Sequence, residues 1–296
     1  MVAPALERSS PPWVAWLRSR GARATGRLGN VPVAVAIPLG FLILLAAACF
    51  LWPLVYHVPP PFDAPNPVPN LPLFSPGHIL GTDPVGNDVL SRILYGGRVS
   101  LEVGFGVAAL GLVVGGSVGV LAGFWAGAFD AVVMRVLDVL IAFPSLALAL
   151  AVAEGLGPSE LHVIWALAFF SVPAFARISR AATLRLRGQT YVLASVLSGT
   201  KTWRVMLRHL TPNVFPQLLT FGLLNVGVAI VIEGALDFLG LGIPPPTPSW
   251  GGMIALGQQN LSSNPSLLLV PSAFLLVTVL ALNRLGDALR AWWGIT

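Results

Sequence analysis

The stretch QTYVLASVLSGTKTWRVMLRHLTPN (residues 189–213) is polar and basic, and it interrupts a sequence that is otherwise largely apolar. Residues 191–198 have the composition of a short helix, Gly199 permits a sharp turn, and a second helix is expected to follow. Pro212 is expected to end that helix, because proline lacks a backbone N–H and its ring clashes with the preceding turn. The pattern therefore predicts two short helices between membrane-crossing segments.

The second of these helices has one apolar face. Its apolar residues recur with helical spacing, at Trp203, Met206, Leu207 and Leu210. Thr200 or Thr202 is expected to cap its start, and Arg204 and Arg208 lie on another face. A segment too polar to insert and too apolar to float free is suited to docking on a cytoplasmic protein. A juxtamembrane helix held by anionic lipid is the alternative.

Composition identifies an integral membrane protein. Of the 296 residues, 55% are hydrophobic and 10% are charged, whereas roughly a quarter are charged in soluble domains. The basic residues cluster in short loops instead of forming a continuous stripe, which argues against nucleic-acid binding. Cys49 is the only cysteine and the four histidines are scattered, so no disulfide framework or metal cluster is expected.

Six apolar runs approach one bilayer thickness each. They cover residues 31–56, 99–125, 132–153, 161–178, 214–235 and 267–283. All but two of the 17 lysines and arginines, Arg92 and Arg98, fall on the side that holds both termini and residues 177–208. By the positive-inside rule, both termini and the stretch 189–213 are expected to be cytoplasmic. The predicted fold class is all-α and integral to the membrane, with six transmembrane helices.

The predicted domain organisation follows from these runs. In order, it comprises a basic cytoplasmic tail (1–30), a first transmembrane helix (31–56), an external loop with a short amphipathic helix (57–98), a five-helix core (99–285) and a cytoplasmic tail (286–296). The core includes the cytoplasmic helices of residues 189–213. The first tail is either a surface helix or disordered. The external helix is expected to begin at Asp83 and Pro84, a capping acid followed by a proline at the first helical position.

Four other stretches carry a family resemblance. They are GTDPVGNDVLSR (81–92), RVLDVLIAFPS (135–145), FLGLGIPPPTPSWG (238–251) and NRLGDALR (283–290). With the stretch 189–213 they resemble the C-type permeases of the dipeptide, oligopeptide and nickel branch of ABC importers. The resemblance runs in order through residues 30–290.

Residues 189–213 are similar to the cytoplasmic coupling motif of these permeases. Leu193, Ala194 and Ser195 stand at the family's Glu-Ala-Ala triplet, followed by Gly199 and Pro212. Leu193 replaces the acidic residue, so a salt bridge from this position is not expected, and the contact is expected to depend on shape and apolar packing. In the external stretch, Asn87 stands where the branch commonly has arginine.

The resemblance implies a function and a set of partners. It implies a type I importer permease in a prokaryotic plasma membrane, paired with a second homologous permease, two cytoplasmic ABC ATPases and an external or periplasmic solute-binding protein. The implied solute is a di- or oligopeptide, with nickel or another small solute as the alternative. The sequence lacks the pattern G-x-x-x-x-G-K-[ST]. The chain is therefore expected to be no enzyme and to bind no cofactor, with ATP and magnesium held by the ATPases.

Two groups of functional residues are expected. The ATPase-coupling group is Tyr191, Ala194, Ser195, Gly199, Trp203, Arg204, Arg208 and Pro212. Acids near or within spans mark pathways, so the pathway or gate group is Glu102, Asp138, Phe143, Glu233 and Trp250.

Four of the pathway residues carry a second expectation. Pairing with Arg135 is favoured for Asp138, which lies three residues away. For Glu233, a gate or lining role and simple interfacial exposure remain open. Trp250 suits the membrane interface, and the residue before Pro144 is expected to mark a kink.

Two other classes of protein fit less well. A membrane-embedded enzyme needs converging nucleophile, base or metal ligands, and no His or acid pair is placed for that. A proton-coupled secondary transporter, the remote alternative, needs several acids at mid-membrane, and Asp138 alone is weak support.

Overall fold

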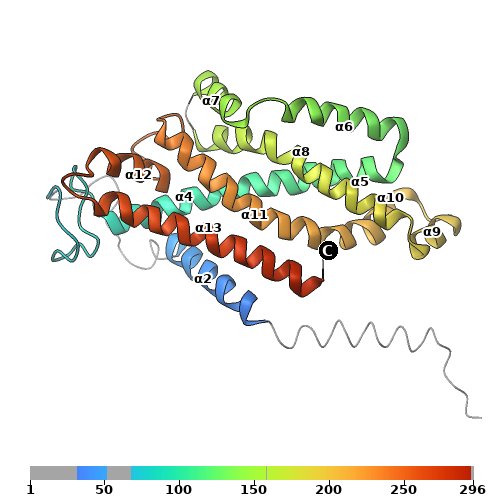
Figure 1. Cartoon of the computed structure of the whole chain (residues 1–296), viewed down its shortest axis with the longest axis horizontal. Coiled ribbons are helices and arrows are strands. Elements are labelled where there is room, and N and C mark those ends of the chain that lie inside the picture. The colour runs from blue at the N-terminus through green and yellow to red at the C-terminus, as the bar shows by residue number, and fades with distance from the viewer. Residues whose placement is uncertain (1–31, 52–67, 158, 295–296) are drawn as a thin grey trace, which may run out of the picture.

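The computed structural model describes residues 32–51, 68–157 and 159–294, and in this part of the chain the fold is built from helices (Figure 1). The long helices are α2 (Val33–Phe50), α4 (Val89–Leu110), α8 (Glu160–Arg187), α11 (Thr211–Phe238) and α13 (Ser266–Trp293). The shorter ones are α5 (Gly116–Trp125), α6 (Gly127–Ile141), α7 (Ser145–Leu156), α9 (Thr190–Leu197), α10 (Thr202–Val205) and α12 (Trp250–Gln259). Two π-helical segments, η1 (Gly111–Gly115) and η2 (Met206–Leu210), join neighbouring helices. The predicted tail 1–30 and the loop residues 57–67 lie outside the described residues.

Five helical segments of the described chain are long and apolar enough to cross a membrane. They are Val33–Phe50, Val89–Trp125, Glu160–Arg187, Thr202–Phe238 and Ser266–Trp293. Each contains or overlaps one of the apolar runs expected from the sequence. The all-α membrane fold is therefore confirmed, and the number of six spans stays a prediction.

The remaining apolar run, residues 132–153, is divided between two helices. α6 ends at Ile141, and α7 begins at Ser145 after Pro144 in an extended conformation. Proline disfavours the helical conformation for the residue before it, which accounts for the break at Phe143. α6 and α7 follow one another along α8 in Figure 1. Together they cover the third of the six apolar runs expected to cross the membrane.

The start of α4 differs from the prediction. Asp83 does not begin a helix. Its carboxylate accepts hydrogen bonds from the backbone N–H groups of Val85 and Asn87 and from the Asn87 side chain, which closes a turn. The cap is Asp88, which accepts from the Ser91 N–H at 2.7 Å. Residues 89–98 are the first turns of α4, so the separate amphipathic helix expected before residue 99 is wrong for the described part, 68–98.

α5 packs on α8 at very short range. Gly115, Gly119 and Gly123 recur every four residues and present one bare face of α4–η1–α5 to the α8 backbone. A Cβ added to Gly119 would lie 2.2 Å from the Ala176 carbonyl oxygen, closer than any real contact. Small residues at this spacing let membrane helices approach backbone to backbone. The glycines of this run therefore position α8, which carries the chain to the stretch 189–213.

Pro212 does not end the second helix of the stretch 189–213, contrary to the sequence prediction. The helix passes from α10 through η2 into α11, and Pro212 lies in the first turn of α11. In η2 the turn is one residue wider, and the Thr211 N–H donates to the Met206 carbonyl five residues back. A π-helical turn displaces the backbone that the proline ring would otherwise strike, and the first turn of a helix needs no proline N–H. Residues 202–238 are thus one helical segment.

The described helices place two groups of segments at opposite ends of the fold. α9 and the C-terminal end of α13 lie toward one end, and α12 and residues 68–88 lie toward the other (Figure 1). Between them, a core cluster that includes Cys49, Leu101, Ile230, Trp250 and Leu282 ties α2, α4, α11, α12 and α13 together. Any event at α9 is therefore linked to the opposite end through long packed helices.

Candidate functional site

α9 is anchored to the fold by one buried face. Val192 is fully buried and packs in a cluster with Val205 of α10 and Leu210 of η2, against Phe124 and Leu186. These contacts join α9 to the ends of α5 and α8. A movement of α9 would therefore be transmitted to the helices that carry these side chains.

The turn after α9 is fixed by backbone hydrogen bonds. The Gly199 N–H donates to the Val196 carbonyl, and the Thr200 N–H donates to the Ser195 carbonyl. Gly199 has φ +75°, which a residue with a Cβ adopts only at a cost. The predicted sharp turn is present, and Lys201, not Thr200 or Thr202, occupies the cap position of α10.

Apart from Val192, the surface of α9 is largely apolar and uncovered. Leu193 and Leu197 lie one turn apart and are 50% and 87% exposed, and Tyr191 and Val196 are also exposed. Ala194 lies on the same exposed part of the helix. An exposed leucine pair on a short, rigidly held helix is typical of a protein-binding surface. We call Tyr191, Leu193, Val196 and Leu197 the α9 face.

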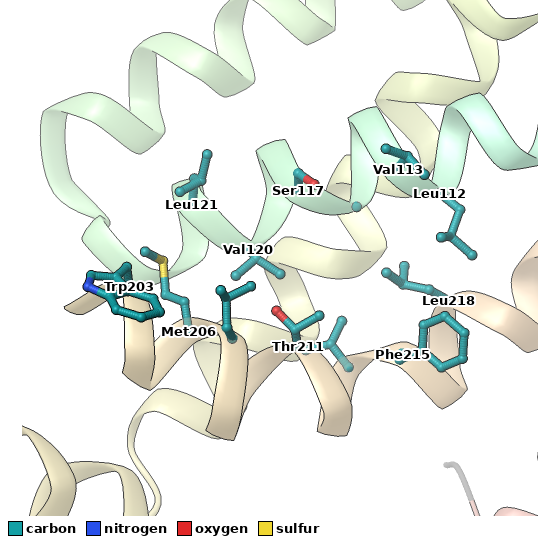
Figure 2. A pocket seen from close by; sticks show the side chains of 13 residues that line it. Leu112, Val113, Ser117, Val120, Leu121, Trp203, Met206, Thr211, Phe215 and Leu218 are labelled. Atoms are coloured by element: carbon teal, nitrogen blue, oxygen red, sulfur yellow. The ribbon is translucent and has the colours of Figure 1, made fainter. Parts of the chain in front are cut away.

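The second half of the stretch 189–213, which forms α10 and η2, lies beside a groove. Of the expected stripe, Leu210 is buried, whereas Trp203, Met206 and Leu207 line a groove between α10–η2–α11 and η1–α5 (Figure 2). The groove has a volume of about 470 Å³. Its other walls include Val120 and Leu121 of α5 and Phe215 and Leu218 of α11. Arg204 and Arg208 are exposed beside it.

Two expected pathway acids form ion pairs. Glu102 accepts a hydrogen bond from Arg98 at 2.9 Å, one turn earlier on α4. Asp138 pairs with Arg177 of α8 at 2.6 Å, and both side chains are about half exposed. The predicted pairing of Asp138 with Arg135 on its own helix is therefore wrong. The structure instead uses the acid to hold α6 against α8.

A second bridge between α6 and α8 was missed by the sequence reasoning. Asp130 accepts two hydrogen bonds from the Arg180 guanidinium, each at 2.5 Å, and its side chain is 10% exposed. Asp130 lies in the first turn of α6, and Arg180 of α8 lies 50 residues later. Only the antiparallel placement of α6 and α8 identifies the pair, which no local spacing could reveal.

Glu233 and Trp250 lie in the interior, so interfacial exposure is wrong for both. Glu233 is fully buried near the end of α11, and among the described residues no group forms a hydrogen bond of accepted geometry with its carboxylate oxygens. Trp250 begins α12, packs against Gly97 of α4 and donates its indole N–H to the Ile93 carbonyl at 3.1 Å. Phe143, between α6 and α7, is about half exposed.

Asp237, which the sequence reasoning also missed, holds the loop between α11 and α12. It accepts hydrogen bonds from the Ile243 N–H at 2.6 Å and from the Ser249 hydroxyl. Ser249 in turn caps α12 through the Gly252 N–H. The signal in the sequence was an acid placed directly before a glycine- and proline-rich loop. The loop supplies the hydrogen bonds that the carboxylate accepts.

The described residues offer no ready metal site. Within residues 32–51, 68–157 and 159–294, no three His, Cys, Asp or Glu side chains come together as possible ligands. The features that this part of the chain offers for function are the α9 face, the groove, and Glu102 of α4 and Glu233 of α11.

Comparisons with known proteins agree on one family. The family model described as the binding-protein-dependent transport system inner membrane component matches residues 115–293. A glutathione transport system permease protein of Pectobacterium atrosepticum is 38% identical, covering 86% of this chain and 85% of that protein. A dipeptide transport system permease protein of Alkalihalophilus pseudofirmus is 37% identical, covering 76% of this chain and 74% of that protein.

One solved structure is similar in fold. A chain of the methionine ABC transporter in an inward-facing conformation superposes with a TM-score of 0.56 at 18% identity. The match covers 69% of this chain and 96% of that chain. At this identity the likeness concerns the fold alone.

Proposed function

Because the chain belongs to the family of binding-protein-dependent transport system inner membrane components, we propose that it forms half of the solute path of an ATP-driven peptide importer. Membership confirms the permease resemblance and the importer-permease fold drawn from the sequence motifs. The relatives named above transport glutathione and dipeptides, and both solutes are small peptides. A di- or oligopeptide is accordingly the proposed solute.

A second permease forms the other half of this solute path. The outer side of α6 carries an uncovered apolar row, at Phe129, Val132, Val136 and Val139. A second permease of the same fold offers a helical surface of similar chemistry. ATP and magnesium belong to two cytoplasmic ATPases, because this sequence has no phosphate-binding loop of its own.

The α9 face is the proposed contact with an ATPase, and its combination of one anchored side and one exposed apolar side is the observation that carries the proposal. Closure of the ATPases would push α9, and Val192 would pass the movement to α8 and α10. The long helices would then rock between an outward and an inward opening. With Leu193 at the position where the family usually has an acid, apolar packing supplies the contact.

The test replaces Leu197 with aspartate in the complete importer, purified with its second permease, ATPases and binding protein. Leu197 is 87% exposed, so the substitution removes little internal packing, and a charge in the contact is expected to lower both ATPase co-purification and peptide uptake. Val85→Asp is the matched control, because Val85 is an exposed apolar residue outside α9. Unchanged ATPase co-purification and uptake in Leu197→Asp would exclude the α9 face as the coupling surface.

Solute identity needs a separate measurement. Proteoliposomes that hold the complete importer are expected to accumulate labelled dipeptides when ATP is supplied to the ATPase side. Accumulation of nickel without any peptide uptake would overturn the peptide proposal and leave the coupling proposal standing. Uptake by the lone chain without ATPases would overturn both.

A further inference from the structure

The groove in Figure 2 is chemically unsuited to a peptide. The side chains that line it carry no charge, and its hydroxyl groups are those of Ser117 and Thr211. A peptide brings charged termini and backbone N–H and C=O groups that would lose their hydrogen bonds to water there. The groove is therefore separate from the proposed solute path, and its occupant is apolar.

The direction of the groove matches that of a lipid tail. It follows one helical segment from Trp203 to Leu218, a distance of about 22 Å at 1.5 Å per residue. This segment belongs to the candidate span Thr202–Phe238, so the groove runs along the membrane normal. It begins at the cytoplasmic stretch and reaches toward the middle of a hydrocarbon layer about 30 Å thick.

The cytoplasmic mouth of the groove carries an aromatic ring and positive charge. The Arg204 guanidinium lies 5.3 Å from the centre of the Trp203 ring. Lys201 precedes α10 and is exposed, as is Arg204. Tryptophan and basic side chains are characteristic of the headgroup level of a membrane, and each basic residue near the surface attracts anionic lipid.

The size of the groove excludes a whole helix as its occupant. A helix about 10 Å across and 22 Å long fills roughly 1,700 Å³, several times the 470 Å³ of the groove. A single hydrocarbon chain is far thinner. A neighbouring helix could close the groove only from outside.

We propose that the groove holds one acyl chain of an anionic phospholipid from the cytoplasmic leaflet, with the phosphate beside Lys201 and Arg204 and the tail against Val120 and Leu218. The placement uses the cytoplasmic side assigned to α9, but it does not depend on which solute is carried. One wall of the site is η2, which connects α9 to α11. The lipid therefore fills a space that changes shape when the coupling segment moves.

The test uses photo-crosslinking in the complete importer. The complex is placed in phosphatidylcholine nanodiscs that contain phosphatidylglycerol with a diazirine on its acyl chain, and labelled peptides are mapped by mass spectrometry. Residues 112–121 and 203–218 are expected to be labelled several-fold more than the exposed surface of α13 around Leu276. Equal labelling of the two regions would overturn the proposal.

Two variants separate the tail from the headgroup. Ser117→Phe fills the groove and is expected to remove the excess labelling, whereas Val228→Phe, at an exposed position of α11 outside the groove, leaves it intact. Lys201→Gln with Arg204→Gln keeps the groove and lowers the preference for phosphatidylglycerol over phosphatidylcholine by roughly fivefold for each charge removed. Retained excess labelling in Ser117→Phe, or an unchanged lipid preference in the double variant, would contradict the assignment.

A last arm tests the competing occupant. If Val113→Cys forms a disulfide with a cysteine in the second permease and the groove residues stay unlabelled by lipid, the groove is a subunit interface. The lipid proposal is then wrong, while the importer function remains testable by peptide uptake.

Discussion

Asp130 and Asp138 lie eight residues apart on α6 and bind arginines of α8 with the same chemistry, but their surroundings differ. The Asp130 side chain is 10% exposed and receives two hydrogen bonds from Arg180. Asp138 and Arg177 are each about half exposed, and one hydrogen bond joins them. Solvent screens exposed pairs, whereas a buried charge that loses its partner keeps its desolvation penalty.

Asp130→Asn is therefore expected to destabilise the chain more than Asp138→Asn. The expected losses are about 1–2 kcal/mol for Asp130→Asn and less than about 1 kcal/mol for Asp138→Asn. Thermal unfolding of the purified complex measures both, and Arg135→Gln serves as the control that tests the discarded pairing. A larger loss for Arg135→Gln than for Asp138→Asn would restore the local pair.

At the level of single residues, the sequence pointed to some of the ionisable groups but not to their partners. Asp138 was singled out as an acid within a span, but its partner lies 39 residues away, whereas helical spacing pointed to Arg135. Trp250 has the chemistry of an interfacial residue, and its burial depends on Gly97 leaving room for the ring. Partners and burial are set by which helices touch, which a single sequence without an alignment does not encode locally.

Among the helices, two prolines expected to interrupt a helix had different effects. Pro144 separates α6 from α7, whereas Pro212 is absorbed by the wider turn of η2 and the chain stays helical. Both outcomes accommodate a residue that has no backbone N–H to donate. The choice between a break and a π turn depends on the neighbouring packing, here Leu210 held in the cluster below α9.

The glycine run of η1 and α5 gives a prediction for the packing of two helices. Gly119→Ala places a methyl group 2.2 Å from the Ala176 carbonyl oxygen, so α5 and α8 must separate. Alanine favours a helix by about 1 kcal/mol over glycine, and overpacking costs about 1–3 kcal/mol. Gly119→Ala is therefore expected to lower the unfolding temperature of the complex.

Gly155→Ala in α7 is the matched control, because nothing lies within 4 Å of the added Cβ. This variant gains helix propensity without a clash and is expected to be neutral or slightly stabilising. If Gly119→Ala proved as stable as Gly155→Ala, close contact between α5 and α8 would not be needed for stability.

For the whole molecule, hydrophobic run length and the distribution of charge were sufficient to predict the fold class. Both are one-dimensional properties that the bilayer itself imposes on any spanning chain. The α9 turn was also predictable, since Gly199 is required by a backbone conformation local to it. The groove was not predictable, because its two walls lie about 90 residues apart and meet only in the folded chain.

The orientation of the chain can be tested with single cysteines, since its only natural cysteine, Cys49, is fully buried. Four exposed positions are replaced one at a time by cysteine: Ile79, Ala128, Glu154 and Leu197. A maleimide that cannot cross membranes is expected to label positions 79 and 154 in intact cells. Positions 128 and 197 are expected to react only after the membrane is opened.

The pair at Ala128 and Glu154 decides the number of crossings. Ala128 lies in the first turn of α6, and Glu154 lies in the last turn of α7. Each of these helices is too short to appear as a span alone, but they follow one another along α8. If the two helices together cross the bilayer, the labels fall on opposite sides, giving six crossings and both termini inside. Labelling of both positions from one side would mean that residues 127–156 re-enter without crossing. The termini would then lie on opposite sides after five crossings, and the chain would no longer follow the positive-inside rule.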